Sequence, residues 1–104
     1  MSEPQSVIGI DLGTTNSCVA LFKSNLGGNA EVLPNDLGES VTESRVAFGA
    51  NGKIIVGKQA VNKPNHIYDV KRMIGLNWGD ESVSEFMRKW PFEVKESAEG
   101  TFNI

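Results

Sequence analysis

The chain of 104 residues is long enough for one small domain and too short for two ordinary ones. A hydrophobic content of 39% and a charged content of 22% exclude a disordered chain, and a net charge of −3 with interspersed acids and bases argues against a nucleic-acid partner. The single cysteine excludes an intrachain disulfide. With no secretory leader and no apolar run long enough for a membrane, we expect a cytoplasmic protein that contacts no membrane.

The first predicted element is a β-hairpin. Residues 7–12 and 17–22 are short, nearly continuous apolar runs, as expected for strands buried on both faces. The four small and polar residues 13–16 between them, Gly-Thr-Thr-Asn, form a tight turn. A glycine- and asparagine-rich loop over residues 24–29, a third strand over 31–33 and a turn over 34–38 follow.

A second hairpin is predicted from two apolar runs on either side of a turn dipeptide. Residues 45–48 and 53–56 are the strands, and Asn51 and Gly52 both tolerate the positive φ that such turns require. Residues 58–62 are expected to form a short helix.

The clearest predicted helix lies further along the chain. Val83, Phe86, Met87 and Trp90 fall on one apolar stripe at helical spacing, which favours a packing surface over a partner-binding face. Asp80 is positioned to cap its N-terminus.

A last strand, turn and strand are predicted over residues 92–95, 97–100 and 101–104. The final strand ends on a hydrophobic residue. A domain that continues beyond it and an ordinary edge strand are equally good interpretations of that ending.

The tip of the first hairpin is the best candidate site. A turn that contains Gly13, Thr14 and Thr15 presents backbone N–H groups and hydroxyls at one point, and such a cradle attracts phosphate oxygens. Asp11, at the end of the preceding strand, could hold Mg²⁺ through its waters. An ordinary hairpin turn uses the same residue types, so both interpretations stay open here. Neither a P-loop nor a dinucleotide-binding fingerprint occurs.

Four stretches of the chain resemble the 70-kilodalton heat-shock chaperones. Residues 8–20, IGIDLGTTNSCVA, are similar to the family's first phosphate-binding segment. The other stretches match in order and spacing: 35–38 with 45–48, 56–60 with 64–65 and 69–75, and 90–92. Residues 42–44 depart from the family pattern, because Thr-Glu-Ser replaces the usual Thr-Pro-Ser.

The resemblance implies an α/β fold, part of a ribonuclease-H-like, actin-like ATPase lobe, with a mixed β-sheet, hairpins and few short helices. Residues 1–104 would then be the first part of lobe one of the nucleotide-binding domain. The resemblance also implies a role for each site residue. Asp11 would hold Mg²⁺ through water, Gly13, Thr14, Thr15 and Asn16 would surround the β- and γ-phosphates, Lys71 would reach the γ-phosphate and the attacking water, and Arg72 would lie toward the adenine.

The implied function is that of a chaperone segment that binds ATP or ADP with Mg²⁺, and with K⁺ as a further candidate ion. The parent would couple ATP hydrolysis to the binding and folding of unfolded polypeptides, together with co-chaperones. We expect the chain alone to bind nucleotide weakly and not to turn over, because half a cleft leaves water around the phosphates. A sugar- or acetate-kinase-like enzyme and a non-enzymatic, self-associating interaction fragment are the alternatives.

Overall fold

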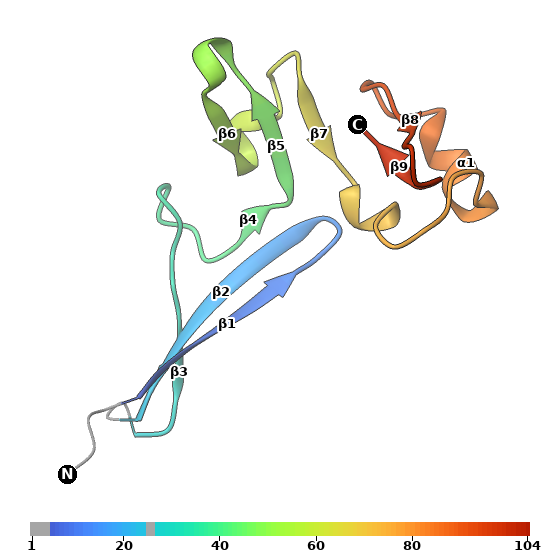
Figure 1. Cartoon of the computed structure of the whole chain (residues 1–104). Coiled ribbons are helices and arrows are strands. Elements are labelled where there is room, and N and C mark those ends of the chain that lie inside the picture. Colours follow the sequence, from blue (N-terminus) through green and yellow to red (C-terminus); the bar gives the residue numbers. More distant parts are fainter. Residues whose placement is uncertain (1–4, 25–26) are drawn as a thin grey trace. The chain divides into compact units, whose positions relative to one another are not determined.

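The computed structural model describes residues 5–24 and 27–104, which divide into two compact units (Figure 1). Unit 1 comprises Met1–Ser44 and unit 2 comprises Arg45–Ile104. The described residues do not include 1–4 or 25–26. The expectation about a leader rests partly on residues 1–4, and residues 25–26 belong to the predicted loop. The fold is α/β, with strands in antiparallel sheets and few short helices, so the predicted class is confirmed.

Unit 1 is built on the predicted first hairpin. Strands β1 (Ser6–Leu12) and β2 (Asn16–Lys23) pair antiparallel in a continuous register from Ser6↔Lys23 to Leu12↔Ser17. The other long edge of β2 pairs with two short strands, β3 (Ala30–Val32) near its end and β4 (Thr42–Glu43) at its start. β2 is therefore the central strand of this sheet, and β1 lies at its edge (Figure 1).

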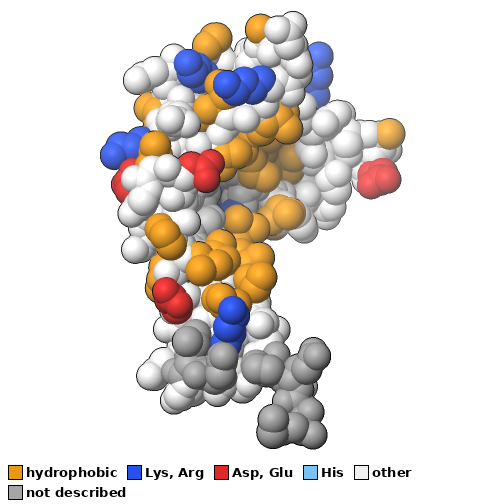
Figure 2. Space-filling view, turned by 90° about the vertical axis from the view of Figure 1, so that its left-hand side faces the viewer, with side chains coloured by type: hydrophobic (Ala, Val, Ile, Leu, Met, Phe, Trp, Pro, Cys, Tyr) orange, Lys and Arg blue, Asp and Glu red, His pale blue; other side chains and the backbone are white. Residues whose placement is uncertain are grey.

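The prediction that the two strands of this hairpin are buried on both faces is wrong: the residues of β1 are exposed, and those of β2 are half-buried or exposed. Val7, Ile8, Ile10 and Leu12 are 57%, 61%, 70% and 65% exposed, and no buried hydrophobic residue of the described chain lies in unit 1. Figure 2 shows hydrophobic side chains gathered at the surface of the molecule. An apolar run indicates which residues favour burial, but burial also needs a second layer of structure, and the described residues do not cover these faces.

The turn predicted over residues 34–38 is held by one side chain. Asn35 Oδ1 accepts hydrogen bonds from the backbone N–H groups of Leu37 (2.9 Å) and Glu39 (3.0 Å). Its Nδ2 donates to Thr42 Oγ1 at 3.0 Å. Asn35 thereby links the turn to β4, the strand that returns the chain to the start of β2.

Unit 2 begins with the predicted second hairpin. Strands β5 (Arg45–Phe48) and β6 (Ile54–Val56) flank the 3-10 helix η2 (Ala50–Gly52), and β7 (His66–Tyr68) pairs with the other edge of β5. Asn51 and Gly52 have φ of 61° and 73°, as the turn dipeptide predicts.

The helix predicted over residues 58–62 is a four-residue 3-10 helix instead, η3 (Gly57–Ala60). Gly57 has a φ of 79°, so it cannot form the first turn of an α-helix. The three residues of η3 that remain, 58–60, are too few to repay the cost of nucleating an α-helix.

The core of unit 2 lies around helix α1 (Glu81–Met87). Met73, Val83 and Trp90 are buried together, and Phe86 and Met87 are among the half-buried side chains packed against them, so the predicted stripe is a packing surface. Ala47 and Ala60 are also buried. In the part of the chain that the structure describes, no helix combines the length and apolar character needed to cross a membrane.

The predicted C-terminal hairpin is also present. Strands β8 (Lys95–Glu96) and β9 (Phe102–Asn103) pair antiparallel. Between them, Ser97 Oγ accepts the backbone N–H of Thr101 at 3.0 Å, which closes the turn.

Asp80 caps α1 as predicted, and the cap makes the stability of the helix depend on pH in the acidic range. The Ser82 hydroxyl and backbone N–H both donate to its carboxylate, and these bonds hold the pKa of Asp80 below its ordinary value of 3.8. Because the pKa of this carboxyl is lower in the folded state, its ionised form stabilises the fold when the pH lies above the unfolded-state pKa. This contribution is lost as the pH falls through the folded-state pKa. We expect acidification below about pH 4 to lower the melting temperature of wild-type unit 2 more than that of Asp80→Asn, whose amide caps without titrating. Circular dichroism melts from pH 6 to pH 2 measure the difference, and parallel curves would contradict it.

Candidate phosphate-binding site

The tip of the β1–β2 hairpin is closed by a very close backbone approach. The N–H of Gly13 donates to the carbonyl oxygen of Asn16 at 3.0 Å. A Cβ atom on residue 13 would collide with that same oxygen. Glycine is therefore required here by the lack of space, and the turn that the sequence predicts can form only with a residue that has no side chain.

Two backbone donors at the tip remain available to a ligand. Within the described residues, the N–H groups of Thr14 and Thr15 donate to no protein acceptor. Thr14 is half-buried and Thr15 is exposed. Adjacent backbone N–H groups in a turn attract anionic oxygens, so the tip has the donor set that the phosphate interpretation requires.

Two carbonyl groups of the tip accept hydrogen bonds from Ser44. Its N–H donates to the Thr15 carbonyl and its hydroxyl donates to the Gly13 carbonyl, both at 2.8 Å. The Ser44 hydroxyl also lies 2.8 Å from Ser17 Oγ. Ser44 thus engages the Gly13 and Thr15 carbonyls, whereas the Thr14 and Thr15 N–H groups donate to no described acceptor. This arrangement favours anions over cations at the tip.

Asp11 lies on β1 opposite Cys18 and is exposed. Its carboxylate is two residues before the tip, which fits a group that holds a hydrated Mg²⁺ beside a phosphate. In the described residues, no group of three or more His, Cys, Asp or Glu side chains could hold a metal ion directly.

The other predicted site residues belong to unit 2. Lys71 and Arg72 lie on the 3-10 helix η4 (Val70–Arg72), and both are exposed. The Nε of Arg72 lies 3.4 Å from Asp69 Oδ1, and its guanidinium carbon lies 4.2 Å from the centre of the Phe86 ring. Arg72 therefore also packs on α1. The structure brings Asp11 and the tip together within unit 1, and Lys71 and Arg72 together within unit 2.

Sequence reasoning missed two residues that organise these segments. Ser44 is 31 positions from Gly13, too far for a local pattern to reveal the bond. Asp69 has a left-handed φ of 61°, and its carboxylate accepts the Trp90 indole N–H at 3.0 Å as well as pairing with Arg72. Its only sequence feature is that aspartate tolerates this conformation better than most residues.

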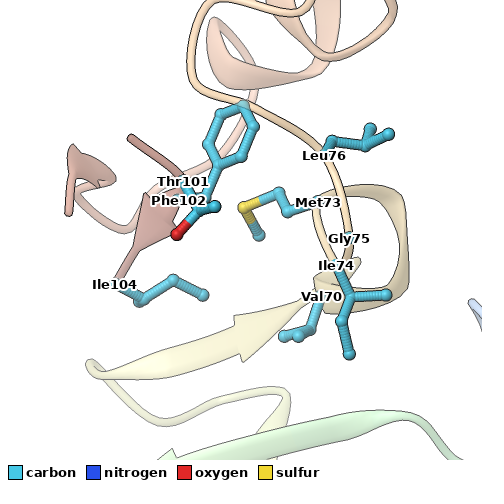
Figure 3. Close-up of a pocket in the computed structure, with 8 residues that line it drawn as sticks. All are labelled: Val70, Met73, Ile74, Gly75, Leu76, Thr101, Phe102 and Ile104. Carbon is cyan, nitrogen blue, oxygen red and sulfur yellow. The ribbon is translucent and has the colours of Figure 1, made fainter. Parts of the chain in front are cut away.

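Unit 2 also contains a hollow of about 260 Å³ next to η4. Figure 3 shows the Met73 side chain extending toward Thr101 and Phe102, with Ile104 below them. Its lining contains no charged side chain and no predicted site residue, so it does not suit a phosphate. The lining residues are Val70, Met73, Ile74, Gly75, Leu76, Thr101, Phe102 and Ile104.

The fold is consistent with part of an actin-like ATPase lobe, which is the class of fold that the chain represents. The features that agree are the antiparallel hairpins, the few helices and the glycine-threonine tip beside a carboxylate. Comparison with protein-family models identifies the family. The model described as Hsp70 protein matches residues 7–104, almost the whole chain. The chain therefore belongs to the Hsp70 family, and the match supports a fragment of that family's nucleotide-binding domain.

Proposed function

We propose that this chain is the N-terminal ATP-binding segment of a cytoplasmic chaperone, and that both units belong to lobe one of its nucleotide-binding domain. The parent would couple ATP binding and hydrolysis to the binding and folding of unfolded polypeptides, with co-chaperones as partners. Membership of the Hsp70 family supports the chaperone assignment. The observation that carries the ATP assignment is the pair of available N–H groups on Thr14 and Thr15 at a tip closed by Gly13.

Each site residue has a role that suits phosphoryl transfer to water, a reaction that depends on positioning and charge neutralisation. The N–H groups of Thr14 and Thr15 donate to oxygens of the β- and γ-phosphates, and Gly13 allows their close approach. Asn16 completes the rim of this cradle. Asp11 holds the waters of Mg²⁺, and that ion supplies neutralisation of phosphate charge when it is bound.

Lys71 and Arg72 supply positive charge from unit 2. The compact ammonium group of Lys71 suits the γ-phosphate and the attacking water. Arg72, already held by Asp69 and Phe86, faces the adenine side in this proposal. The family match favours these roles over a sugar- or acetate-kinase-like enzyme.

We expect the chain alone to bind nucleotide weakly and to hydrolyse none. Asp11, Thr15 and Asn16 are exposed, so water competes for the Thr15 N–H and screens the Asp11 charge. Self-association through the exposed apolar side chains of β1 stays a prediction.

Titration of the ¹⁵N-labelled chain with MgATP tests the proposal. We expect amide shifts at Thr14 and Thr15 with a dissociation constant of about 1 mM or weaker, and no phosphate release above the blank. Asp11→Asn should remove the dependence of these shifts on Mg²⁺ and leave the hairpin intact. Shifts confined to other residues, or a complete lack of response at the tip, would contradict the phosphate assignment.

A further inference from the structure

Glu43 is a charged residue next to the hairpin tip that the roles above do not use. It lies on β4, directly opposite Asn16 on β2. Opposed residues of an antiparallel pair have Cα atoms about 4.5–5.5 Å apart, so the Glu43 backbone is an immediate neighbour of the tip.

The strand register places Glu43 and Asp11 on the same face of the sheet. Side chains of Asn16 and Cys18 share a face because they are two positions apart on β2. Glu43 is the cross-strand partner of Asn16, and Asp11 is the partner of Cys18. Ser17 and Ser44, whose hydroxyls meet at 2.8 Å, alternate with these residues and mark the opposite face.

The Glu43 carboxylate has no cationic partner among the described residues. Its Oε2 is buried and has no hydrogen-bond partner there. No Lys, Arg or His of that part of the chain pairs with it. A phosphate on the tip would therefore meet an uncompensated negative charge, partly shielded from water, on the face that carries Asp11.

We propose that Glu43 lowers the affinity of the hairpin tip for anions, and so sets how tightly this segment holds a polyphosphate. The inference rests on the proposed function, because it assumes that the tip binds phosphate oxygens. Charge repulsion over one cross-strand spacing acts within the Debye length of about 8–10 Å. Removal of the charge should tighten anion binding by about three- to tenfold.

The experiment measures the affinity of the tip for inorganic pyrophosphate without metal, at fixed ionic strength. The amide shifts of Thr14 and Thr15 are followed in the wild type, in Glu43→Gln and in Glu43→Asp. The control is Glu31→Gln on β3, which makes the same change in net charge. Glu31 pairs with Leu21, five residues from Asn16 along β2 or about 17 Å, beyond the Debye length.

The expected result is tighter binding by Glu43→Gln alone, with Glu43→Asp and Glu31→Gln close to the wild type. Unchanged cross-strand shifts in the free protein verify that each variant keeps the hairpin, and Glu43→Ala replaces Glu43→Gln if the amide disturbs it. If every protein binds pyrophosphate at the tip equally well, Glu43 has no such role and the phosphate site stands. If the tip amides of no variant respond, the inference and the proposed function both fail.

Discussion

Replacement of Trp90 by alanine is expected to cost unit 2 about 3–5 kcal/mol of unfolding free energy, the usual range for a large buried aromatic residue. Trp90 is 7% exposed and stacks on Phe92 at 5.4 Å. A unit of about 60 residues has roughly 3–9 kcal/mol of stability in total. Trp90→Ala should therefore leave unit 2 largely unfolded at 37 °C, and urea denaturation followed by circular dichroism measures the loss.

Two further variants separate the contributions of this residue. Trp90→Phe keeps an aromatic ring but leaves Asp69 Oδ2 without its donor, so an intermediate loss of about 1–3 kcal/mol is expected. Trp78→Ala is the matched control, because Trp78 is only half-buried and contacts Phe102 at the rim of the core. A loss as large in Trp78→Ala as in Trp90→Ala would show that the core is not centred on Trp90.

Replacement of Gly13 by alanine is the second large effect. The added methyl group would collide with the Asn16 carbonyl oxygen, and relief of that collision must open the turn. The expected cost is about 1–3 kcal/mol, the range for overpacking at a site that cannot relax. Unit 1 has no buried hydrophobic residue among those described, so this loss should also depopulate the hairpin and abolish the response of Thr14 and Thr15 to MgATP.

The control for this change lies four residues earlier, on β1. A Cβ on Gly9 meets nothing within 4 Å, so Gly9→Ala should leave the hairpin intact or slightly stabilise it. Amide hydrogen exchange across the β1–β2 register distinguishes the two variants. Equal protection in Gly13→Ala and Gly9→Ala would mean that the close approach at the tip does not limit the turn.

The hairpins and the helix could be predicted because their determinants are local. The Gly-Thr-Thr-Asn turn, the Asn51-Gly52 dipeptide and the Asp80 cap each act on backbone groups within a few residues. The candidate site was predicted for the same reason, since its donors come from consecutive residues of one turn.

What could not be predicted depends on contacts between distant residues. The exposure of β1 follows from the lack of a covering layer in the described chain, which no property of its own residues reveals. The hydrogen bond from Ser44 to Gly13 joins positions that no periodicity links. The same is true of the ion pair between Asp69 and Arg72 and the hydrogen bond between Asp69 and Trp90.

The confinement of the described buried hydrophobic side chains to unit 2 has a consequence for biosynthesis. A ribosome releases the N-terminus first, so the apolar strands of unit 1 emerge before any residue of the buried cluster has been translated. About 60 further residues, at about 5–20 residues per second, take roughly 3–12 seconds. During that interval the nascent strand Ser6–Leu12 is an exposed hydrophobic segment of the kind that makes a growing chain prone to aggregation.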